Sequence, residues 1–215
     1  MVTNDGTRIE SSETLKLLGF IFSGSPTPTA QVNALIAKFR TRLWSLRYLK
    51  RSGMRENDLC QAYVTYLRPV IEYGSVVIHS MLTREQSDLI DRQQVRALKI
   101  VYGFDKSSRQ VLEASGLETL SLRRRKAVDK FAIKLAESDR FGDLFPLRPD
   151  NLRTSRVSQK YLEVGTNRTR LYNSPVYYMR RRLNALEEVP DVRRALLAGG
   201  AGDSQRCDFL YDEWR

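Results

Sequence analysis

The side chains that most often carry catalysis are scarce in this chain of 215 residues. His79 is the only histidine, and Cys60 and Cys207 are the only cysteines. These counts exclude a four-ligand Cys/His zinc site and a disulfide framework. They also leave little material for a Ser/His/Asp or Cys/His catalytic constellation. We therefore expect His79 to lie on a helix surface or at the edge of a core.

Polymerases hold two metal ions with paired carboxylates, and the sequence has no Asp-Asp pair after an apolar strand. Glu187-Glu188 follows a basic run at a predicted helix end, which is typical of a solvated helix terminus. The glycine-rich run 199–202 lacks the following Lys-Ser/Thr of a phosphate loop and is typical of a flexible linker. We predict no catalytic residue, no metal site and no cofactor.

Positive charge is the strongest feature of the composition. Lysine and arginine number 36 against 25 aspartate and glutamate, which gives a formal net charge of +11. A field of this sign attracts polyanions, and nucleic acid is the commonest polyanion inside a cell. The alternative is a basic surface that is only solvated.

The cations are arranged in three basic regions. The first is a predicted helix over residues 28–51, and the second is a stripe along a helix over 121–139, where cations recur at i, i+3, i+7 and i+11. That stripe either follows phosphates or forms a solvated outer face. The third, from residue 148 to 182, interleaves arginines with tyrosines, a mixture that suits single-stranded or A-form nucleic acid. The candidate binding residues in these regions are Lys38, Arg42, Arg47, Arg123, Lys126, Lys130, Lys134, Arg168, Arg170, Tyr172, Arg180 and Arg181.

Hydrophobic periodicity predicts a mainly α fold, a helical bundle with a small N-terminal β-hairpin or strand and a less regular basic C-terminal part. The predicted helices cover 28–51, 56–80, 83–102, 107–116, 121–139 and 174–190. Capping boxes are expected at Thr83 with Gln86 and at Ser107 with Gln110. The predicted buried faces include Val32 to Leu46 in the first of these helices and Phe131 in the fifth. Pro69 lies inside the second helix, so we expect a kink near Tyr66. Residues 15–22 read as one strand with a bulge at Gly19, and Asn4-Asp5-Gly6 reads as a hairpin turn.

Four segments follow from these patterns. Residues 1–25 form a β element, 26–145 a helical domain, 146–190 a basic extension and 191–215 a flexible tail. No apolar run approaches the ~18 residues of a membrane span, and no secretory leader precedes the first helix. We therefore expect no membrane partner and an intracellular location, in the nucleus or cytoplasm.

Several motifs in order resemble the end of the palm, the thumb and the C-terminal extension of non-LTR (LINE-type) retrotransposon reverse transcriptases. The resemblance covers roughly residues 14–186. The motifs that carry it are Lys16-Leu17-Leu18-Gly19-Phe20-Ile21, Arg42-Leu43-Trp44-Ser45-Leu46-Arg47-Tyr48-Leu49, Tyr66-Leu67-Arg68-Pro69-Val70-Ile71-Glu72-Tyr73-Gly74, Asp91 to Ile100, Leu112 to Leu122, Phe141 to Phe145 and Tyr172-Asn173-Ser174-Pro175.

The resemblance implies that Leu18, Gly19 and Phe20 belong to a primer grip and that the helices hold a template–primer duplex. It implies RNA or RNA/DNA hybrid as the partner, together with the palm and fingers that would complete such a polymerase. The family's Tyr/Phe-x-Asp-Asp motif is absent from the sequence. We therefore predict a truncated reverse transcriptase fragment, non-catalytic by itself, that binds nucleic acid through basic helices. The alternative is a helical protein-interaction module with no nucleic-acid role, and the sequence predicts no oligomeric state.

Overall fold

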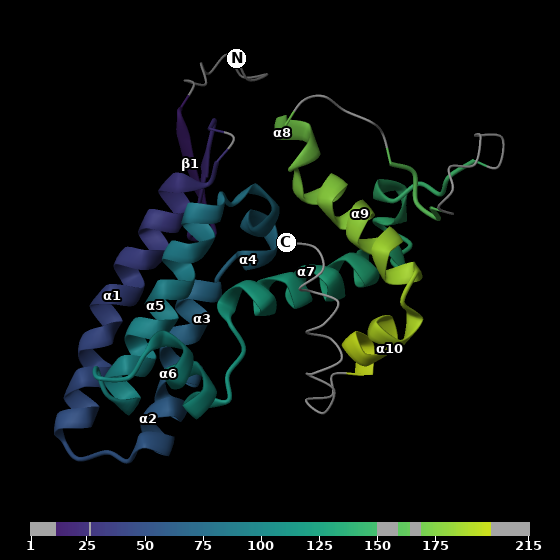
Figure 1. Cartoon of the computed structure of the whole chain (residues 1–215). Coiled ribbons are helices and arrows are strands. Elements are labelled where there is room, and N and C mark those ends of the chain that lie inside the picture. The colour runs from purple at the N-terminus through teal and green to yellow at the C-terminus, as the bar shows by residue number, and fades with distance from the viewer. Residues whose placement is uncertain (1–11, 26, 150–158, 164–168, 199–215) are drawn as a thin grey trace.

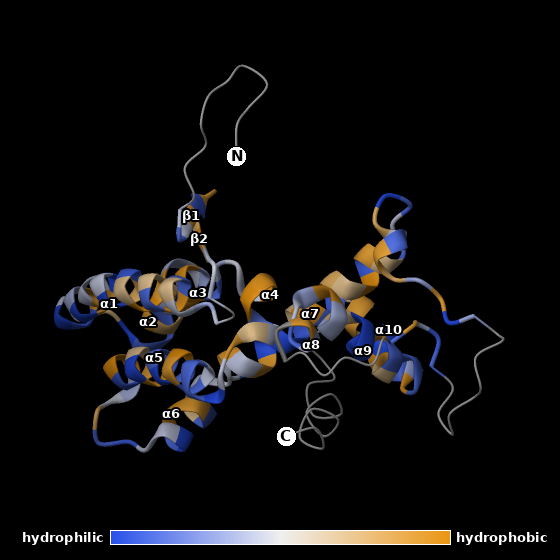
Figure 2. Cartoon of the chain, turned by 90° about the horizontal axis from the view of Figure 1, so that it is seen from above, coloured by the Kyte–Doolittle hydropathy of each residue, from blue (hydrophilic) through white to orange (hydrophobic). Residues whose placement is uncertain are grey.

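The computed structural model describes residues 12–25, 27–149, 159–163 and 169–198. It confirms the predicted fold class, since the described chain is mainly helical with one two-stranded antiparallel sheet at its N-terminal end. A bundle built from α1 to α6 lies beside a smaller group built from α7 to α10 (Figure 1). Within the smaller group, α7 is the helix that begins beside the bundle and runs away from it. The same two groups are seen from above in Figure 2.

The hairpin occupies the segment that we predicted as a single strand. β1 (Thr14–Leu17) pairs with β2 (Phe20–Ser23), and Leu18 and Gly19 form the turn between them. Both turn residues have positive φ, 50° and 79°, as a two-residue hairpin turn requires. Gly19 is therefore a turn residue and not a bulge, while the turn predicted at residues 4–6 lies outside the described residues.

The hairpin is held to the bundle at the start of α1 (Thr29–Arg51) and at the break before α4 (Ser75–Ile78). The buried Gln31 side chain accepts a hydrogen bond of 2.9 Å from the Ile21 amide. The Phe20 ring is buried against Gly74, where a Cβ atom would lie 2.7 Å from the ring. Gly74 also has φ 69°, so both space and backbone require glycine here.

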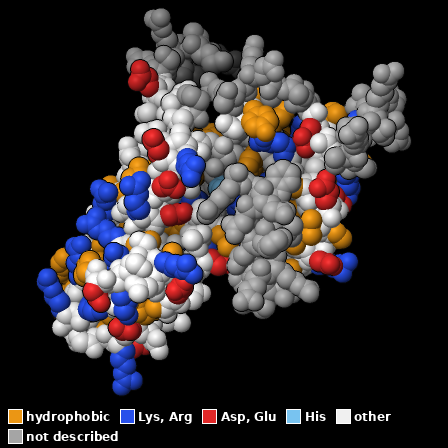
Figure 3. All heavy atoms as spheres, viewed as in Figure 1, with side chains coloured by type: hydrophobic (Ala, Val, Ile, Leu, Met, Phe, Trp, Pro, Cys, Tyr) orange, Lys and Arg blue, Asp and Glu red, His pale blue; other side chains and the backbone are white. Residues whose placement is uncertain are grey.

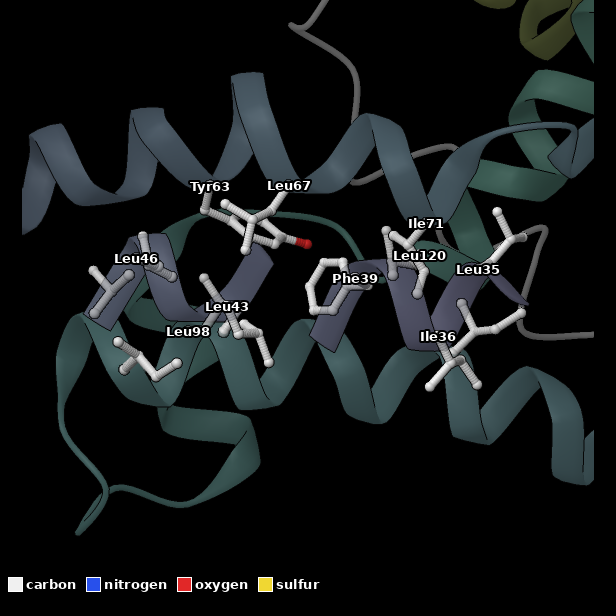
Figure 4. Close-up of a cluster of buried hydrophobic side chains, with 14 of the residues drawn as sticks. Leu35, Ile36, Phe39, Leu43, Leu46, Tyr63, Leu67, Ile71, Leu98 and Leu120 are labelled. Atoms are coloured by element: carbon white, nitrogen blue, oxygen red, sulfur yellow. The ribbon is translucent and has the colours of Figure 1, made fainter. Parts of the chain in front are cut away.

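The bundle core is apolar and forms as the helical spacing predicts. Val32, Leu35, Ile36, Phe39, Leu43 and Leu46 of α1 are all buried. They face Tyr63, Leu67 and Ile71 on one side and Leu98 on the other (Figure 4). Contacts of Thr29 with Gln86, Arg40 with Gln93 and Lys50 with Val101 show that α1 and α5 (Arg84–Tyr102) run parallel.

The predicted second helix is divided by a π segment. α2 (Glu56–Ala62) passes into η1 (Tyr63–Leu67), a stretch of π-helix, and then into α3 (Arg68–Glu72). The Arg68 amide bonds to the Tyr63 carbonyl five residues back, directly before Pro69, which has no amide hydrogen. The irregularity thus lies where the kink was expected.

The extra residue of the π segment shifts the buried face by one position. A continuous helix would bury Val70, Gly74 and Val77 after Leu67. The structure instead buries Ile71. The helix then breaks at Tyr73 and Gly74, and after this break α4 buries Ser75 and Ile78 and leaves Val77 39% exposed.

Two capping boxes fix the next helices as predicted. Thr83 and Gln86 exchange hydrogen bonds at the start of α5, and Ser107 and Gln110 do so at the start of α6 (Ser108–Ser115). The buried Gln94 amide then donates to the Glu118 carbonyl and accepts from the Leu120 amide. These two bonds fix the entry to α7 (Leu120–Ala136) against α5.

A second core lies between α7, α9 (Pro175–Glu187) and α10 (Pro190–Ala198). α7 contributes Val128, Ala132 and Ile133, while α9 contributes Met179, Leu183 and Leu186. Phe145 and Tyr161 also belong to this core, so it extends across the predicted boundary at residue 145. The short helices η2 (His79–Met81), η3 (Gly142–Leu144) and α8 (Thr169–Tyr172) complete the described elements.

The predicted flexible tail is wrong for residues 191–198. α10 begins at Pro190, and Val192 and Leu196 are buried against the second core. Proline suits the first turn of a helix, so Pro190 starts α10 as well as following the end of α9.

Candidate nucleic-acid interface

The solvent-exposed sides of α1 form a basic surface. α1 contains no Asp or Glu, and its cations are Lys38, Arg40, Arg42, Arg47, Lys50 and Arg51. Arg47 and Arg51 project into solvent one turn apart. Figure 3 shows Lys and Arg side chains gathered along the edge of the molecule that α1 forms.

The charges of these α1 cations are not neutralised within the described part of the chain. Their polar contacts there are to neutral oxygens: Arg40 to the Gln93 side chain at 3.4 Å, Arg42 to the Tyr66 carbonyl at 3.2 Å, and Lys50 to a backbone carbonyl of α5. None of the six lies within ion-pair distance of a described carboxylate. Because no described carboxylate pairs with these cations, their charges are available to a ligand.

The second half of α5 continues this surface. Residues 92–102 contain no acidic side chain, and their cations are Arg92, Arg96 and Lys99. Arg92 and Arg96 are exposed, and no ion pair involves them in the described structure. Because α5 lies parallel to α1, the cations on the α5 side of α1 and those of α5 form one basic face. We call it the α1/α5 surface, and its members are Arg40, Arg47, Arg51, Arg92 and Arg96.

Exposed aromatic rings accompany the cations of α1. Trp44 is 64% exposed and Tyr48 is 58% exposed, and their rings stack at a centroid distance of 5.5 Å. On the other flank, the Arg42 guanidinium lies 4.8 Å from the centre of the Tyr66 ring. No local sequence pattern indicated that two of these rings would stack.

The predicted stripe on α7 is divided by ion pairs. Arg123 donates two hydrogen bonds to Glu72, at 2.5 and 3.3 Å, and Lys126 pairs with Glu118 at 2.5 Å. Lys130 and Lys134 are exposed. The structure thus leaves only one end of the stripe, Lys130 and Lys134, directed to solvent without a described carboxylate partner.

The other predicted C-terminal residues contact their own chain. Arg181 stacks over Tyr172, with the guanidinium carbon 3.5 Å from the ring centre, and donates to the Tyr172 carbonyl. Arg180 donates to the Leu144 carbonyl at 2.9 Å and lies over the Tyr177 ring. Arg168 and the side chain of Arg170 lie outside the described part of the chain.

The predicted primer-grip residues occupy the hairpin tip and its root. Leu18 is 87% exposed, and its carbonyl accepts a hydrogen bond from the Tyr73 hydroxyl. Phe20 is only 8% exposed and is a core residue. Of the three, therefore, Leu18 and Gly19 remain accessible to a ligand, while Phe20 anchors the turn.

Charged groups are buried where α7 meets its neighbours. Arg124 is 1% exposed and bonds to Asp91 at 3.3 Å and to Ser87 at 2.7 Å. The fully buried Asp129 accepts two bonds from Arg182, at 2.9 and 2.8 Å. Burial raises the pKa of Asp91 and lowers that of Arg124, because desolvation of each group exceeds the attraction between them.

His79 lies in the same region. Its Nε2 is 3.2 Å from the Tyr178 hydroxyl, and its buried Nδ1 has no partner among the described residues. Burial, followed by the charges of Arg124, Arg125 and Arg182, lowers the pKa of His79 from 6.5 to about 3. The imidazole is therefore neutral near pH 7, at the edge of a core as expected.

No group of three or more metal-binding side chains occurs among the residues that the structure describes, and no described helix is long and apolar enough to cross a membrane. Comparison with protein-family models, with curated proteins and with solved structures found no match.

The structure adds to the sequence-predicted site. Arg40, Arg51, Arg92 and Arg96 join Arg47 on one face, and Trp44 and Tyr48 lie beside it. Lys38 and Arg42 lie on the opposite flank of α1. The absence of acids from 29–51 and from 92–102 is visible in the sequence. The pairing of the two stretches depends on their parallel packing, which no local pattern reveals.

Proposed function

We propose that this chain is a nucleic-acid-binding helical module, similar to the thumb and extension of a non-LTR reverse transcriptase and without catalytic activity of its own. The ligand is RNA or an RNA/DNA hybrid of template and primer. The α1/α5 surface grips phosphates. The hairpin tip, at Leu18 and Gly19, faces the palm and fingers of such a polymerase.

One observation carries the proposal: no described carboxylate neutralises the cations of the α1/α5 surface. Two helical stretches without an acid lie side by side, and no described carboxylate pairs with their side chains. Neighbouring cations on one helix face are about 5–6 Å apart, and each can meet a different phosphate of a strand. Such contacts give affinity with little base specificity, because phosphates are the same in every sequence.

The proposal is tested by titrating a labelled RNA/DNA hybrid duplex with the full chain and following fluorescence anisotropy from 50 to 300 mM salt. We expect affinity to fall steeply with salt, since each phosphate contact releases counterions. Arg47→Gln combined with Arg51→Gln should lower the slope of log K against log salt by about 2, that is, about 1 for each contact.

The matched control is Lys130→Gln combined with Lys134→Gln, which removes the same charge from exposed positions four residues apart on α7. It should leave the slope nearly unchanged. Equal effects of the two pairs would mean that net charge, and not the α1/α5 surface, drives binding. No binding at 50 mM salt would remove the proposal, and primer extension with Mg²⁺ by the purified chain would contradict its non-catalytic part.

A second function has one observation in its favour. The hairpin exposes Leu15, Leu17, Leu18 and Phe22, and exposed apolar side chains in one small element are typical of a protein contact. A helical protein-interaction module would bind its partner in a pull-down that survives nuclease treatment. Loss of the partner after nuclease would favour the nucleic-acid function instead.

A further inference from the structure

The stacked Trp44 and Tyr48 rings are unusual among the exposed apolar side chains of the bundle. Both rings are more than half exposed, at 64% and 58%, and their planes differ by only 20°. They are four residues apart on α1, so they lie over successive turns of one helix face. Single exposed aromatic residues are common on protein surfaces, whereas two rings held nearly parallel form a platform.

Cations line one flank of this platform. On the helix surface, the neighbours of Trp44 at three and four residues are Arg40, Thr41, Arg47 and Tyr48, and the neighbours of Tyr48 include Arg51. Arg40, Arg47 and Arg51 have no described carboxylate within ion-pair distance. A ligand that covers the rings therefore also meets three positive charges.

Flat faces and positive charges together match the chemistry of an unpaired nucleotide. A base offers a flat π face to a ring, and its phosphate offers a negative charge to an arginine. Bases inside a duplex are already stacked on one another, so a side-chain platform cannot reach their faces. Phosphates, in contrast, are open to arginine in single strands and in duplexes alike.

We infer that Trp44 and Tyr48 stack on the bases of a single-stranded segment, while Arg47 and Arg51 hold its phosphates. The inference rests on the proposed function and names the ligand of the same surface more closely: nucleic acid with unpaired nucleotides, such as a template that extends beyond its duplex. Arg47 and Arg51 contact the phosphates of both duplex and single-stranded nucleic acid, whereas the two rings contact only unpaired bases.

The test uses Trp44 as its own reporter. Trp214 is the only other tryptophan, so Trp214→Phe leaves Trp44 as the single source of indole fluorescence. The ligands are a twelve-nucleotide oligothymidine, an abasic oligomer with the same number of phosphates, and a blunt RNA/DNA hybrid. Oligothymidine should quench the fluorescence and bind roughly tenfold to a hundredfold more tightly than the abasic strand.

Trp44→Ala combined with Tyr48→Ala should remove this difference and leave affinity for the abasic strand and the blunt hybrid within about twofold. The control Phe104→Ala with Phe131→Ala removes two other exposed rings, 68% and 43% exposed, and should change none of the three affinities. Arg47→Gln with Arg51→Gln should weaken all three ligands together.

Two failures are distinguishable. Equal binding of oligothymidine and abasic strand without quenching would overturn the stacking inference, while salt-dependent hybrid binding through Arg47 and Arg51 would leave the proposed function in place. Absence of binding to all three ligands would overturn both.

Discussion

On α1, Arg47 and Arg51 end in solvent, whereas on α7 Arg123 and Lys126 end on the carboxylates of Glu72 and Glu118. Both helices are rich in cations, so their sequences look alike as basic stripes. Their surroundings differ, because α1 packs with apolar faces while α7 packs against acidic side chains from α3, α5 and the loop before it. Cation content alone therefore does not identify a polyanion site; the partners of the cations do.

The interiors differ in the same way. The core around α1 is formed by side chains such as Phe39, Leu43 and Leu98, whereas α7 buries Arg124 and Asp129 beside its apolar residues. The charged side chains of the bundle lie on its surface, whereas several charged side chains are buried where α7 packs against its neighbours. We call this second region the α7 junction. Four experiments test this contrast.

Arg124→Ala should have the largest effect. It leaves the Asp91 carboxylate without its cation in a site where Arg124 is 1% exposed. Breaking one side of a buried pair lowers the free energy of unfolding by roughly 3–5 kcal/mol. Urea unfolding measures this change, and Arg96→Ala, an exposed cation of α5, is the control at about 0.5 kcal/mol or less. Similar losses of unfolding free energy in the two variants would mean that the buried pair at α7 contributes no more to stability than an exposed cation does.

The pH dependence should come next. The folded chain keeps the pKa of His79 near 3, below its ordinary value of 6.5, so the unfolded state takes up a proton that the folded state does not. Stability is thus complete above pH 6.5 and falls as pH decreases, by about 2 kcal/mol at pH 5. His79 is the only histidine, and His79→Gln should remove this fall of the unfolding free energy between pH 7 and 5. A slope that persists in the variant would contradict a buried neutral imidazole.

Tyr63→Phe should have a smaller effect of opposite sign. The Tyr63 hydroxyl is buried in the bundle core without a described hydrogen-bond partner. Its removal should raise the free energy of unfolding by about 1 kcal/mol, because an unpaired buried polar group is destabilising. Tyr178→Phe is the matched variant at the α7 junction, where the hydroxyl bonds to His79, and it should lower stability by a similar amount. Thermal unfolding should show a gain of stability for Tyr63→Phe and a loss for Tyr178→Phe. A loss of stability in both variants would mean that the Tyr63 hydroxyl has a hydrogen-bond partner.

Phe131→Gln should have the smallest effect. Phe131 is 43% exposed on α7, although its apolar character predicted a buried position. We expect a change within about 0.5 kcal/mol. Ile133→Ala, which truncates a fully buried neighbour, should cost about 2–4 kcal/mol by chemical unfolding. A large loss for Phe131→Gln would mean that this ring packs against more of the chain than the described residues.

Local patterns predicted most of the fold. The stripe from Val32 to Leu46 and the capping boxes at Thr83 and Ser107 appear in the structure at the positions that the sequence indicated. These features depend on residues three or four positions apart, which is why the sequence reveals them. The break of 56–80 at Gly74 and the start of α10 at Pro190 were missed, since each depends on how the chain packs against distant elements.

The candidate site was predicted less completely. Arg47 lies on the α1/α5 surface, and Lys38 and Arg42 lie on the opposite flank of α1. Arg123 and Lys126 are instead held by Glu72 and Glu118, at separations of 51 and 8 residues. Whether a cation is free depends on the carboxylate that folding brings to it. The 51-residue separation of the first pair is invisible to any local pattern.

The five-residue π segment before Pro69 has a consequence for how this gene tolerates change. Loss of a single codon there would restore ordinary helical winding and move Ile71 to the position that Val70 would hold in a continuous helix, which is the buried one. Ile71 would keep facing the core, and the ring of Phe20 would keep the bare backbone of Gly74 on which it rests. A one-residue deletion in this stretch should therefore be tolerated far better than a one-residue insertion, which would rotate the residues between the π segment and Tyr73 by about 100°.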